Sequence, residues 1–229
     1  MIAEQLILDL PHRPALGAED FLVSDCNLGA VRLVDAWPDW QNKVQLLIGP
    51  AASGKTHLVR VWQARSGAVT AAPGDAIISA LDALGEAQGL AVEDIDRSGY
   101  DENWLFHLLN LAREKRLFLL MTSREPPGRL DFSLPDLKSR LNGLPVVGIG
   151  APDDTLLKTV MLKHFADRQL SIEPKVLDFL ALHIDRSLAA AAVAVAAVDR
   201  EALSSGSRIT RQLVLKALHR GSGEMEEEA

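Results

Sequence analysis

The segment GPAASGKT, residues 49–56, has the residue types and the spacing of a phosphate-binding loop. Its pattern is G-x-x-x-x-G-K-[ST], in which the glycines let backbone N–H groups turn toward phosphate oxygens and a helix N-terminus adds positive potential. In such a loop Lys55 contacts the β- and γ-phosphates, and the hydroxyl of Thr56 binds Mg²⁺. The sequence therefore predicts a nucleotide site made of Gly49, Pro50, Ala51, Ala52, Ser53, Gly54, Lys55 and Thr56.

Two adjacent carboxylates, Glu93 and Asp94, lie within LAVEDID, residues 90–96. At the C-terminal end of a strand beside a phosphate-binding loop, such residues hold Mg²⁺ and orient a water. The usual order is Asp then Glu, so the second carboxylate is one methylene shorter in this chain. We therefore expect Glu93 to be a Mg²⁺ ligand and Asp94 to be a catalytic residue. Because a displacement of about 1 Å can cost on the order of 10²-fold in rate, we also expect hydrolysis to be slow. A solvated acidic turn is the alternative.

Two other polar segments follow in the chain. In TSREPP, residues 122–127, either Thr122 or Ser123 could contact the γ-phosphate, although short polar residues at strand ends are also common turn formers. Arg140, in DLKSRL, precedes the last predicted strand. It could act on the nucleotide of a neighbouring subunit as an arginine finger does, and a solvated helix arginine explains its position equally well.

The elements that must position these residues alternate along the first two thirds of the chain. Continuous apolar runs such as VQLLI are typical of buried parallel strands, and their alternation with helical patterns predicts an α/β fold, a five-stranded parallel sheet with helices on both faces. After residue 152 only helical patterns follow, which indicates a small all-helical domain. Predicted strands are 44–48, 68–71, 90–92, 117–121 and 146–149; predicted helices are 29–37, 55–64, 76–84, 101–115, 134–141, 153–168, 173–184, 186–203 and 210–220.

Composition excludes several classes of protein. A net charge of −7 and a pI near 5.4 argue against direct DNA binding, which depends on clustered Lys and Arg. Cys26 is the single cysteine, so no disulfide can form within one chain. The longest apolar run, residues 188–198, is shorter than the ~20 residues of a membrane span. We therefore expect a cytoplasmic protein that does not bind membranes.

The motifs together resemble a known family. GPAASGKTHL, the EDID strand, TSREPP, DLKSRL and ADRQLSIEPKVLDFLALHIDRS occur in the order seen in the AAA+ ATPase core of the initiator DnaA, over roughly residues 20–220. The resemblance does not extend to the N-terminal domains or the helix-turn-helix domain of DnaA. Within the DnaA-related AAA+ family the chain resembles Hda-like regulatory proteins, which inactivate DnaA. The resemblance implies an AAA+ P-loop core at 15–150, a helical lid at 151–221, and bound ADP or ATP with Mg²⁺. The acidic residues 222–229 are expected to be disordered.

The N-terminal segment 1–14 is unusually apolar for a chain end. Hda-like proteins carry a peptide of the form Q-L-x-L-x-L that binds the DNA polymerase sliding clamp, and QLILDL, residues 5–10, has this form. The resemblance implies that Leu8 and Leu10 enter a hydrophobic pocket of the clamp while Gln5 hydrogen-bonds at its edge. Burying two leucines contributes about 3–6 kcal/mol before ordering costs. A strand that packs on the protein's own core is the alternative. The expected clamp-binding residues are Gln5, Leu6, Leu8 and Leu10.

The resemblance also assigns roles in the core. Ser123 lies at or near the sensor position of the fourth strand, and Arg140 matches an arginine that acts in trans on the ATP of DnaA. Ala189 stands where the lid of DnaA has a sensor arginine, unless Arg186 substitutes one turn earlier. Weak or absent ATPase activity of its own is therefore expected.

The implied function is a regulator of replication initiation that converts DnaA-ATP to DnaA-ADP and prevents re-initiation. The alternatives are an autonomous AAA+ ATPase such as a DnaC-type helicase loader, a small-molecule P-loop kinase, and a DnaA paralogue that competes without stimulating hydrolysis. The exposed AAA+ faces also make a homodimer an expectation.

Overall fold

The computed structural model describes residues 21–71, 89–97 and 100–227, with side chains described as far as Arg220. The chain divides into two compact units. The first comprises residues 1–50 and 54–150, and the second comprises residues 51–53 and 151–229. The predicted helix 76–84 and the predicted clamp peptide 5–10 lie outside the described residues.

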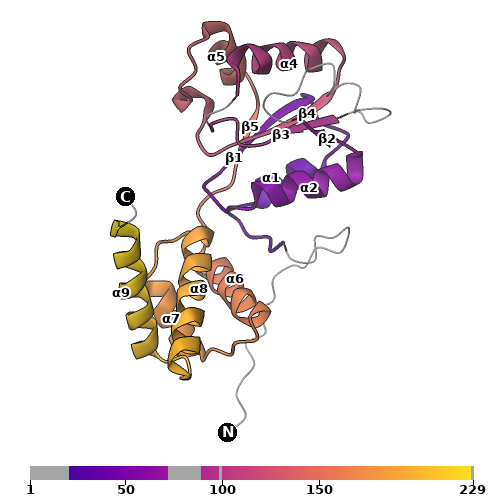
Figure 1. Ribbon diagram of the computed structural model, residues 1–229. Helices are drawn as coiled ribbons and strands as arrows, with labels where there is room; N and C mark the ends of the chain where they lie inside the picture. The colour runs from indigo at the N-terminus through magenta and orange to yellow at the C-terminus, as the bar shows by residue number, and fades with distance from the viewer. Residues whose placement is uncertain (1–20, 72–88, 98–99, 228–229) are drawn as a thin grey trace. The chain divides into compact units, whose positions relative to one another are not determined.

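The described part of the first unit contains a five-stranded sheet in which every pair of neighbours is parallel, in the order β2-β3-β4-β1-β5. The predicted parallel α/β fold is thereby confirmed. β1 lies next to β4 at the centre, so that the residues after both strands meet at one edge of the sheet (Figure 1). The strands are β1 (Val44–Ile48), β2 (Val69–Thr70), β3 (Gly89–Val92), β4 (Phe118–Ser123) and β5 (Val146–Gly148).

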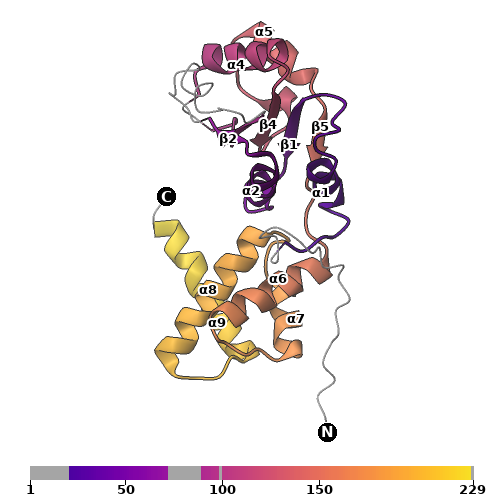
Figure 2. The same cartoon turned by 90° about the vertical axis from the view of Figure 1, so that its right-hand side faces the viewer.

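Helices cover both faces of this sheet. α1 (Leu28–Asp35) and α2 (Lys55–Ser66) lie on one face, and α4 (Glu102–Glu114) and α5 (Pro135–Asn142) lie on the other (Figures 1 and 2). A 3₁₀ turn, η1 (Pro127–Arg129), precedes α5.

The apolar runs of the strands serve two cores because side chains along a strand alternate between its faces. Leu46 of β1 belongs to the core under α4 and α5, whereas Leu47 belongs to the core under α1 and α2. Leu119 and Leu120 of β4 divide in the same way. Both faces are therefore buried, which is why these strands read as continuous hydrophobic runs.

Two acidic side chains fix the starts of α4 and α5. Asp101 caps α4 by accepting hydrogen bonds from the backbone N–H groups of Asn103 and Trp104, at 2.7 and 3.3 Å. Glu102 accepts hydrogen bonds from the backbone N–H groups of Ser133 and Leu134, at 2.7 and 2.6 Å. These two backbone hydrogen bonds hold the pKa of Glu102 below its usual value. The first turn of α4 thus anchors the segment that leads into α5.

The second unit is helical throughout its described length from residue 154 onward, apart from the connections. Its helices are α6 (Asp154–Asp167), α7 (Pro174–Leu182), α8 (Leu188–Ser205) and α9 (Arg211–Glu227). The alanine-rich face of α8, with Ala191, Ala194 and Val198 buried, lets α6 and α9 pack closely against it. None of the helices in the described part of the chain has both the length and the apolar character needed to cross a bilayer.

One difference from expectation lies at the end of the chain. Residues 222–229 were expected to be disordered, but α9 continues to Glu227. Extending a helix that is already formed adds a hydrogen bond for each residue fixed, whereas starting a new helix is the costly step. Glu and Met are also good helix formers, which partly offsets the low helix propensity of Gly221 and Gly223.

A buried carboxylate joins α8 to α9. Glu201 is 5% exposed and pairs with Lys216 at 2.5 Å and Arg220 at 2.7 Å. The hydrogen bond from Lys216, followed by the charges of Arg220 and Lys216, lowers the pKa of Glu201 against the opposing effect of burial. A carboxylate with a lowered pKa in the folded state stabilises the fold above its unfolded pKa, near 4.5, and this contribution is lost as the pH falls below that value.

We therefore expect Glu201→Gln to lower the free energy of unfolding of the helical unit at pH 7 and to have a smaller effect at pH 3, because the contribution of the charged carboxylate declines once the pH is below its unfolded pKa. Urea unfolding followed by circular dichroism at both pH values measures this. Asp178→Asn is the matched control, because Asp178 pairs with Lys158 on the surface, where its side chain is 55% exposed. An equal loss of stability at both pH values would contradict the electrostatic explanation.

Candidate nucleotide-binding site

The predicted phosphate-binding loop connects β1 to α2. The backbone N–H of Gly49 donates to the carbonyl of Ser123 at 3.1 Å, which ties the start of the loop to the end of β4. Gly54 immediately precedes α2 and has φ of 96°, a conformation that favours glycine. A Cβ at this position would lie 2.6 Å from the ring of Phe21, so both the backbone and the neighbouring ring require glycine. Ala52 also has a positive φ, of 57°.

Lys55, the first residue of α2, is buried, with 6% of its surface exposed. Its ammonium donates to the carbonyls of Gly49 and Pro50 at 2.6 and 2.8 Å, which holds the side chain over the loop. Burial lowers the pKa of Lys55, and the carboxylates of Asp94 and Asp96 oppose this shift. A desolvated cation held at a helix N-terminus is a site where anionic phosphate oxygens bind favourably.

Ser53 provides a second indication that the loop fits phosphate. Its hydroxyl is buried and has no hydrogen-bond partner among the described residues. An unpaired buried hydroxyl is costly, and a phosphate oxygen would satisfy it. The loop residues therefore fit the nucleotide that the motif predicts.

The strand β3 brings the first of the two carboxylates to the loop. The hydroxyl of Thr56 donates to Glu93 Oε2 at 2.5 Å, so these two predicted metal ligands are in contact. A hydroxyl and a carboxylate supply the hard oxygen ligands that Mg²⁺ prefers. The pair would hold the ion at the N-terminus of α2, beside the phosphates.

Asp94 is held in an unusual conformation. Its φ is 54°, and its backbone N–H donates to the hydroxyl of Thr122 at 2.8 Å. Its carboxylate lies 3.4 Å from the guanidinium of Arg97. The hydroxyl of Tyr100 donates to the backbone carbonyl of Glu93 at 2.6 Å, and burial together with the charges of Asp94 and Glu93 raises the pKa of Tyr100 to about 12. Tyr100 thus stays protonated and fixes the backbone of the acidic pair.

Ser123, the candidate sensor, ends β4 directly opposite Ile48 of β1. The register therefore brings it to the start of the phosphate-binding loop. Its hydroxyl is fully buried and donates to the backbone carbonyl of Glu125 at 2.7 Å, while it accepts from the N–H of Glu125 at 3.2 Å. In this structure Ser123 therefore acts as a turn former, and its hydroxyl proton is used in the hydrogen bond to Glu125.

Arg140 lies away from all of these residues, in the last turn of α5. It lines a pocket together with Val44, the first residue of β1, whereas the phosphate-binding loop follows the last residue of the same strand. At about 3.3 Å per residue the two ends of β1 are about 13 Å apart. The guanidinium carbon of Arg140 lies 4.8 Å from the centre of the Phe106 ring. Arg140 therefore points away from the nucleotide site of its own chain.

The fold agrees with that of known ATPases, although no protein-family model matches the chain. Domain III of the Thermotoga maritima replication initiation protein DnaA superposes with a TM-score of 0.70, at 18% identity over 91% of this chain and 98% of that one. The chain has the AAA+ fold. AMPPCP-bound DnaA from Aquifex aeolicus superposes with a TM-score of 0.65 at 18% identity, over 91% of this chain and 69% of that one. The Thermotoga maritima RuvB Holliday junction branch migration motor superposes with a TM-score of 0.61 at 17% identity, over 85% of this chain and 66% of that one.

In the helical unit of this AAA+ fold, the candidate sensor positions are also described. Ala189 lies in the first turn of α8, and the capping side chain of Ser187 accepts from the N–H of Ala190 at 3.0 Å. Arg186 is ion-paired with Asp154 at the start of α6. A guanidinium already bound to a carboxylate within its own unit must break that pair before it can contact a phosphate.

Sequence reasoning missed several residues that the structure adds to these sites. Tyr100 and Arg97 fix the acidic pair, Phe21 covers the loop, and Phe106 lies beneath Arg140. Their residue types are ordinary, and their roles depend on contacts between distant elements. Only Tyr100, the single tyrosine of the chain and close to the acidic motif, carried a signal that could have been noticed.

Proposed function

We propose that this protein is a regulator of chromosome replication initiation that binds the DNA polymerase sliding clamp and stimulates ATP hydrolysis by DnaA, giving inactive DnaA-ADP and preventing re-initiation. It binds ADP or ATP with Mg²⁺ through its own phosphate-binding loop and has little ATPase activity of its own. It works in the cytoplasm, does not contact DNA directly, and is able to form a homodimer. The AAA+ fold and the likeness to DnaA domain III support the proposal.

The observation that carries the proposal is the position of Arg140. The residue lies at the end of β1 opposite to the phosphate-binding loop and has no carboxylate partner among the described residues. A cation in this position cannot act on its own chain's nucleotide. It is exposed enough to meet the nucleotide of a second AAA+ protein, where a guanidinium stabilises the charge of the phosphoryl-transfer transition state by about 10³–10⁵ in rate.

The acidic pair supports weak hydrolysis by the chain itself. Glu93 is next to Thr56 and suits a Mg²⁺ ligand, but Asp94 is one methylene shorter than the usual second carboxylate and interacts with Arg97. A carboxylate that is short and engaged with a cation is a poor positioner of the attacking water. We therefore assign binding of nucleotide to this site and assign turnover to the site of DnaA.

The tether to the clamp is proposed from the sequence alone, because Gln5, Leu6, Leu8 and Leu10 lie outside the described residues. We expect Gln5→Ala/Leu8→Ala to weaken binding to the sliding clamp of the same organism at least about 10-fold, since it removes one buried leucine and one hydrogen bond. Surface plasmon resonance with immobilised clamp measures this. Ile7→Ala is the matched control, because Ile7 occupies a variable position of the Q-L-x-L-x-L pattern. Equal binding by all three proteins would remove the tether from the proposal.

A reconstituted hydrolysis assay tests the whole proposal. Conversion of DnaA-ATP to DnaA-ADP is followed with the protein, DNA-loaded clamp and Mg-ADP all present, and with each omitted in turn. Stimulation that requires all of them is the expected result. An autonomous ATPase, such as a DnaC-type helicase loader, would hydrolyse ATP without DnaA. A DnaA paralogue that only competes would leave the rate of DnaA hydrolysis unchanged or lower.

A further inference from the structure

The pocket that contains Arg140 has a distinctive charge. It has a volume of about 770 Å³ and opens where α4, α5 and the residues before β1 meet. Four of its lining residues are cationic, namely Lys43, Arg113, Arg116 and Arg140, and none of the residues that line it is acidic. The whole chain, by contrast, has a net charge of −7. The pocket is therefore a local concentration of positive charge on an acidic protein.

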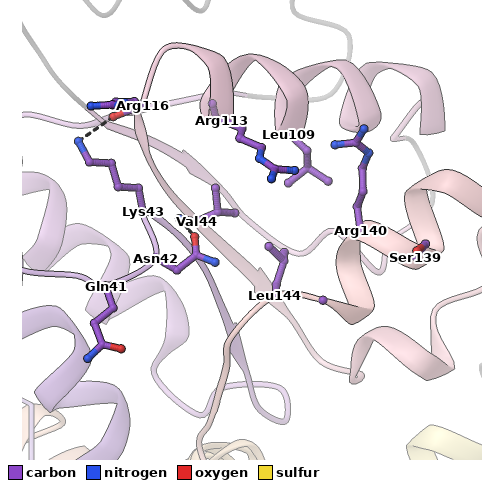
Figure 3. Close-up of a pocket in the computed structure, with 12 residues that line it drawn as sticks. Gln41, Asn42, Lys43, Val44, Leu109, Arg113, Arg116, Ser139, Arg140 and Leu144 are labelled. Carbon is purple, nitrogen blue, oxygen red and sulfur yellow. Dashed lines mark hydrogen bonds between the residues drawn. The ribbon is translucent and has the colours of Figure 1, made fainter.

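The lysine and the arginines of the pocket have different roles. The ammonium of Lys43 donates to the backbone carbonyl of Arg116 at 2.9 Å and lies 4.5 Å from the centre of the Phe118 ring. Lys43 therefore interacts with groups of its own chain. Arg113, Arg116 and Arg140 form no ion pair with any carboxylate of the described residues. Figure 3 shows the guanidinium groups of Arg113 and Arg140 on either side of Leu109, with Arg116 at the far end of the pocket beside Lys43.

The backbone at Arg116 is a separate observation. Arg116 follows the last turn of α4 with φ of 53°, and Leu117 N–H closes the helix by donating to the carbonyl of Ala112 at 2.9 Å. Glycine is the usual residue at such a position because a Cβ disfavours this conformation. Cations do complement the negative end of a helix, but that benefit does not require an arginine at the one position where glycine fits best. Local strain of this kind is often retained at binding sites.

We propose that Arg113 and Arg140 together bind an oligophosphate in this pocket, with Arg116 adding to the local positive potential. Guanidinium groups donate paired hydrogen bonds to phosphate oxygens. Two or three of them match the several charges of a di- or triphosphate, whereas a single carboxylate would leave most of the positive charge uncompensated. The apolar wall formed by Val44, Leu109 and Leu144 excludes water on one side and strengthens these interactions.

The oligophosphate has two potential sources. In the first, a nucleotide bound to the partner ATPase presents its phosphates to the pocket, and Arg113 is then a second cation beside Arg140; this form rests on the proposed function. In the second, a free nucleoside polyphosphate in solution enters the pocket, and this form is independent of the proposed function. The recognition chemistry is the same in both.

Two arms of one experiment distinguish these sources. The first measures stimulation of DnaA hydrolysis by the full chain and by Arg113→Ala. The second titrates inorganic tripolyphosphate into Lys55→Ala, in which the phosphate-binding loop is disabled, and into Lys55→Ala/Arg113→Ala, by isothermal titration calorimetry. Arg129→Ala is the matched control in both arms, because the side chain of Arg129 is 77% exposed, pairs with Glu125 and lies outside the pocket.

Loss of one charged hydrogen-bond donor is expected to lower the affinity or the stimulated rate by about 10- to 100-fold. A loss of this size in stimulation for Arg113→Ala, without binding of free tripolyphosphate, assigns the phosphates to the partner. Tripolyphosphate binding to Lys55→Ala that Arg113→Ala abolishes assigns a free ligand. If Arg113→Ala matches Arg129→Ala in both arms, the inference is wrong. If the wild type itself gives no stimulation, the proposed function fails and the calorimetric arm alone decides the inference.

Discussion

Arg140→Ala is expected to abolish stimulation of DnaA hydrolysis, lowering the stimulated rate by about 10³–10⁵. The side chain would supply positive charge to the transition state in the partner's site. Single-turnover hydrolysis of radiolabelled ATP pre-bound to DnaA, with clamp and DNA present, measures the effect. Alanine also removes the contact with the Phe106 ring, but Arg140 is a partly exposed residue of a short helix, so the fold should persist.

Two comparisons make this result specific. Arg140→Ala should bind ADP as the wild type does, because Arg140 and the phosphate-binding loop lie at opposite ends of β1. Arg140→Lys keeps the charge but loses the planar fork of donors, so it should restore only part of the activity. A fully active Arg140→Ala would instead favour a protein that acts on DnaA by binding alone, without contributing to its chemistry.

Lys55→Ala is expected to weaken ADP binding by at least about 100-fold, because it removes a buried cation that would form more than one charged hydrogen bond to phosphate. Binding is measured by the thermal stabilisation that ligand produces. At a concentration 100 times its Kd, a ligand adds about 2.7 kcal/mol to the free energy of unfolding. For a chain of this size that corresponds to a rise in Tm of about 5–10 °C, and the variant should show almost none of it.

The control for this variant is Lys138→Ala, an exposed lysine of α5. Its ligand-induced rise in Tm should equal that of the wild type. Lys55→Arg keeps the charge but cannot fit the same enclosed position over the carbonyls of Gly49 and Pro50, so it should also bind poorly. Undiminished stabilisation of Lys55→Ala by ADP would mean that the nucleotide binds elsewhere on the chain.

Much of the fold followed from local sequence signals. The strands β1, β3 and β4 are mostly apolar, and such segments are recognisable because both faces of a parallel sheet are buried. α4 was predicted from its amphipathic pattern, with Leu105, Leu108 and Ala112 on one buried face. The end of α9 was predicted less well, because the length of a helix beyond its packed turns depends on cooperativity as well as on composition.

The sequence by itself determined that a phosphate-binding loop follows the first strand, because the motif needs only local backbone geometry and one lysine. It likewise indicated the acidic pair and the change from an α/β to a helical unit. Only the tertiary structure decided which distant groups meet: Thr56 with Glu93, Ser123 with its own turn, and Arg186 with Asp154. The same is true of Arg140 and Arg113, which are far apart in the chain and share a pocket only because α4 and α5 lie on one face of the sheet. Spacing along a sequence specifies local geometry, whereas these contacts depend on strand order and helix packing, which bring together residues that no local pattern connects.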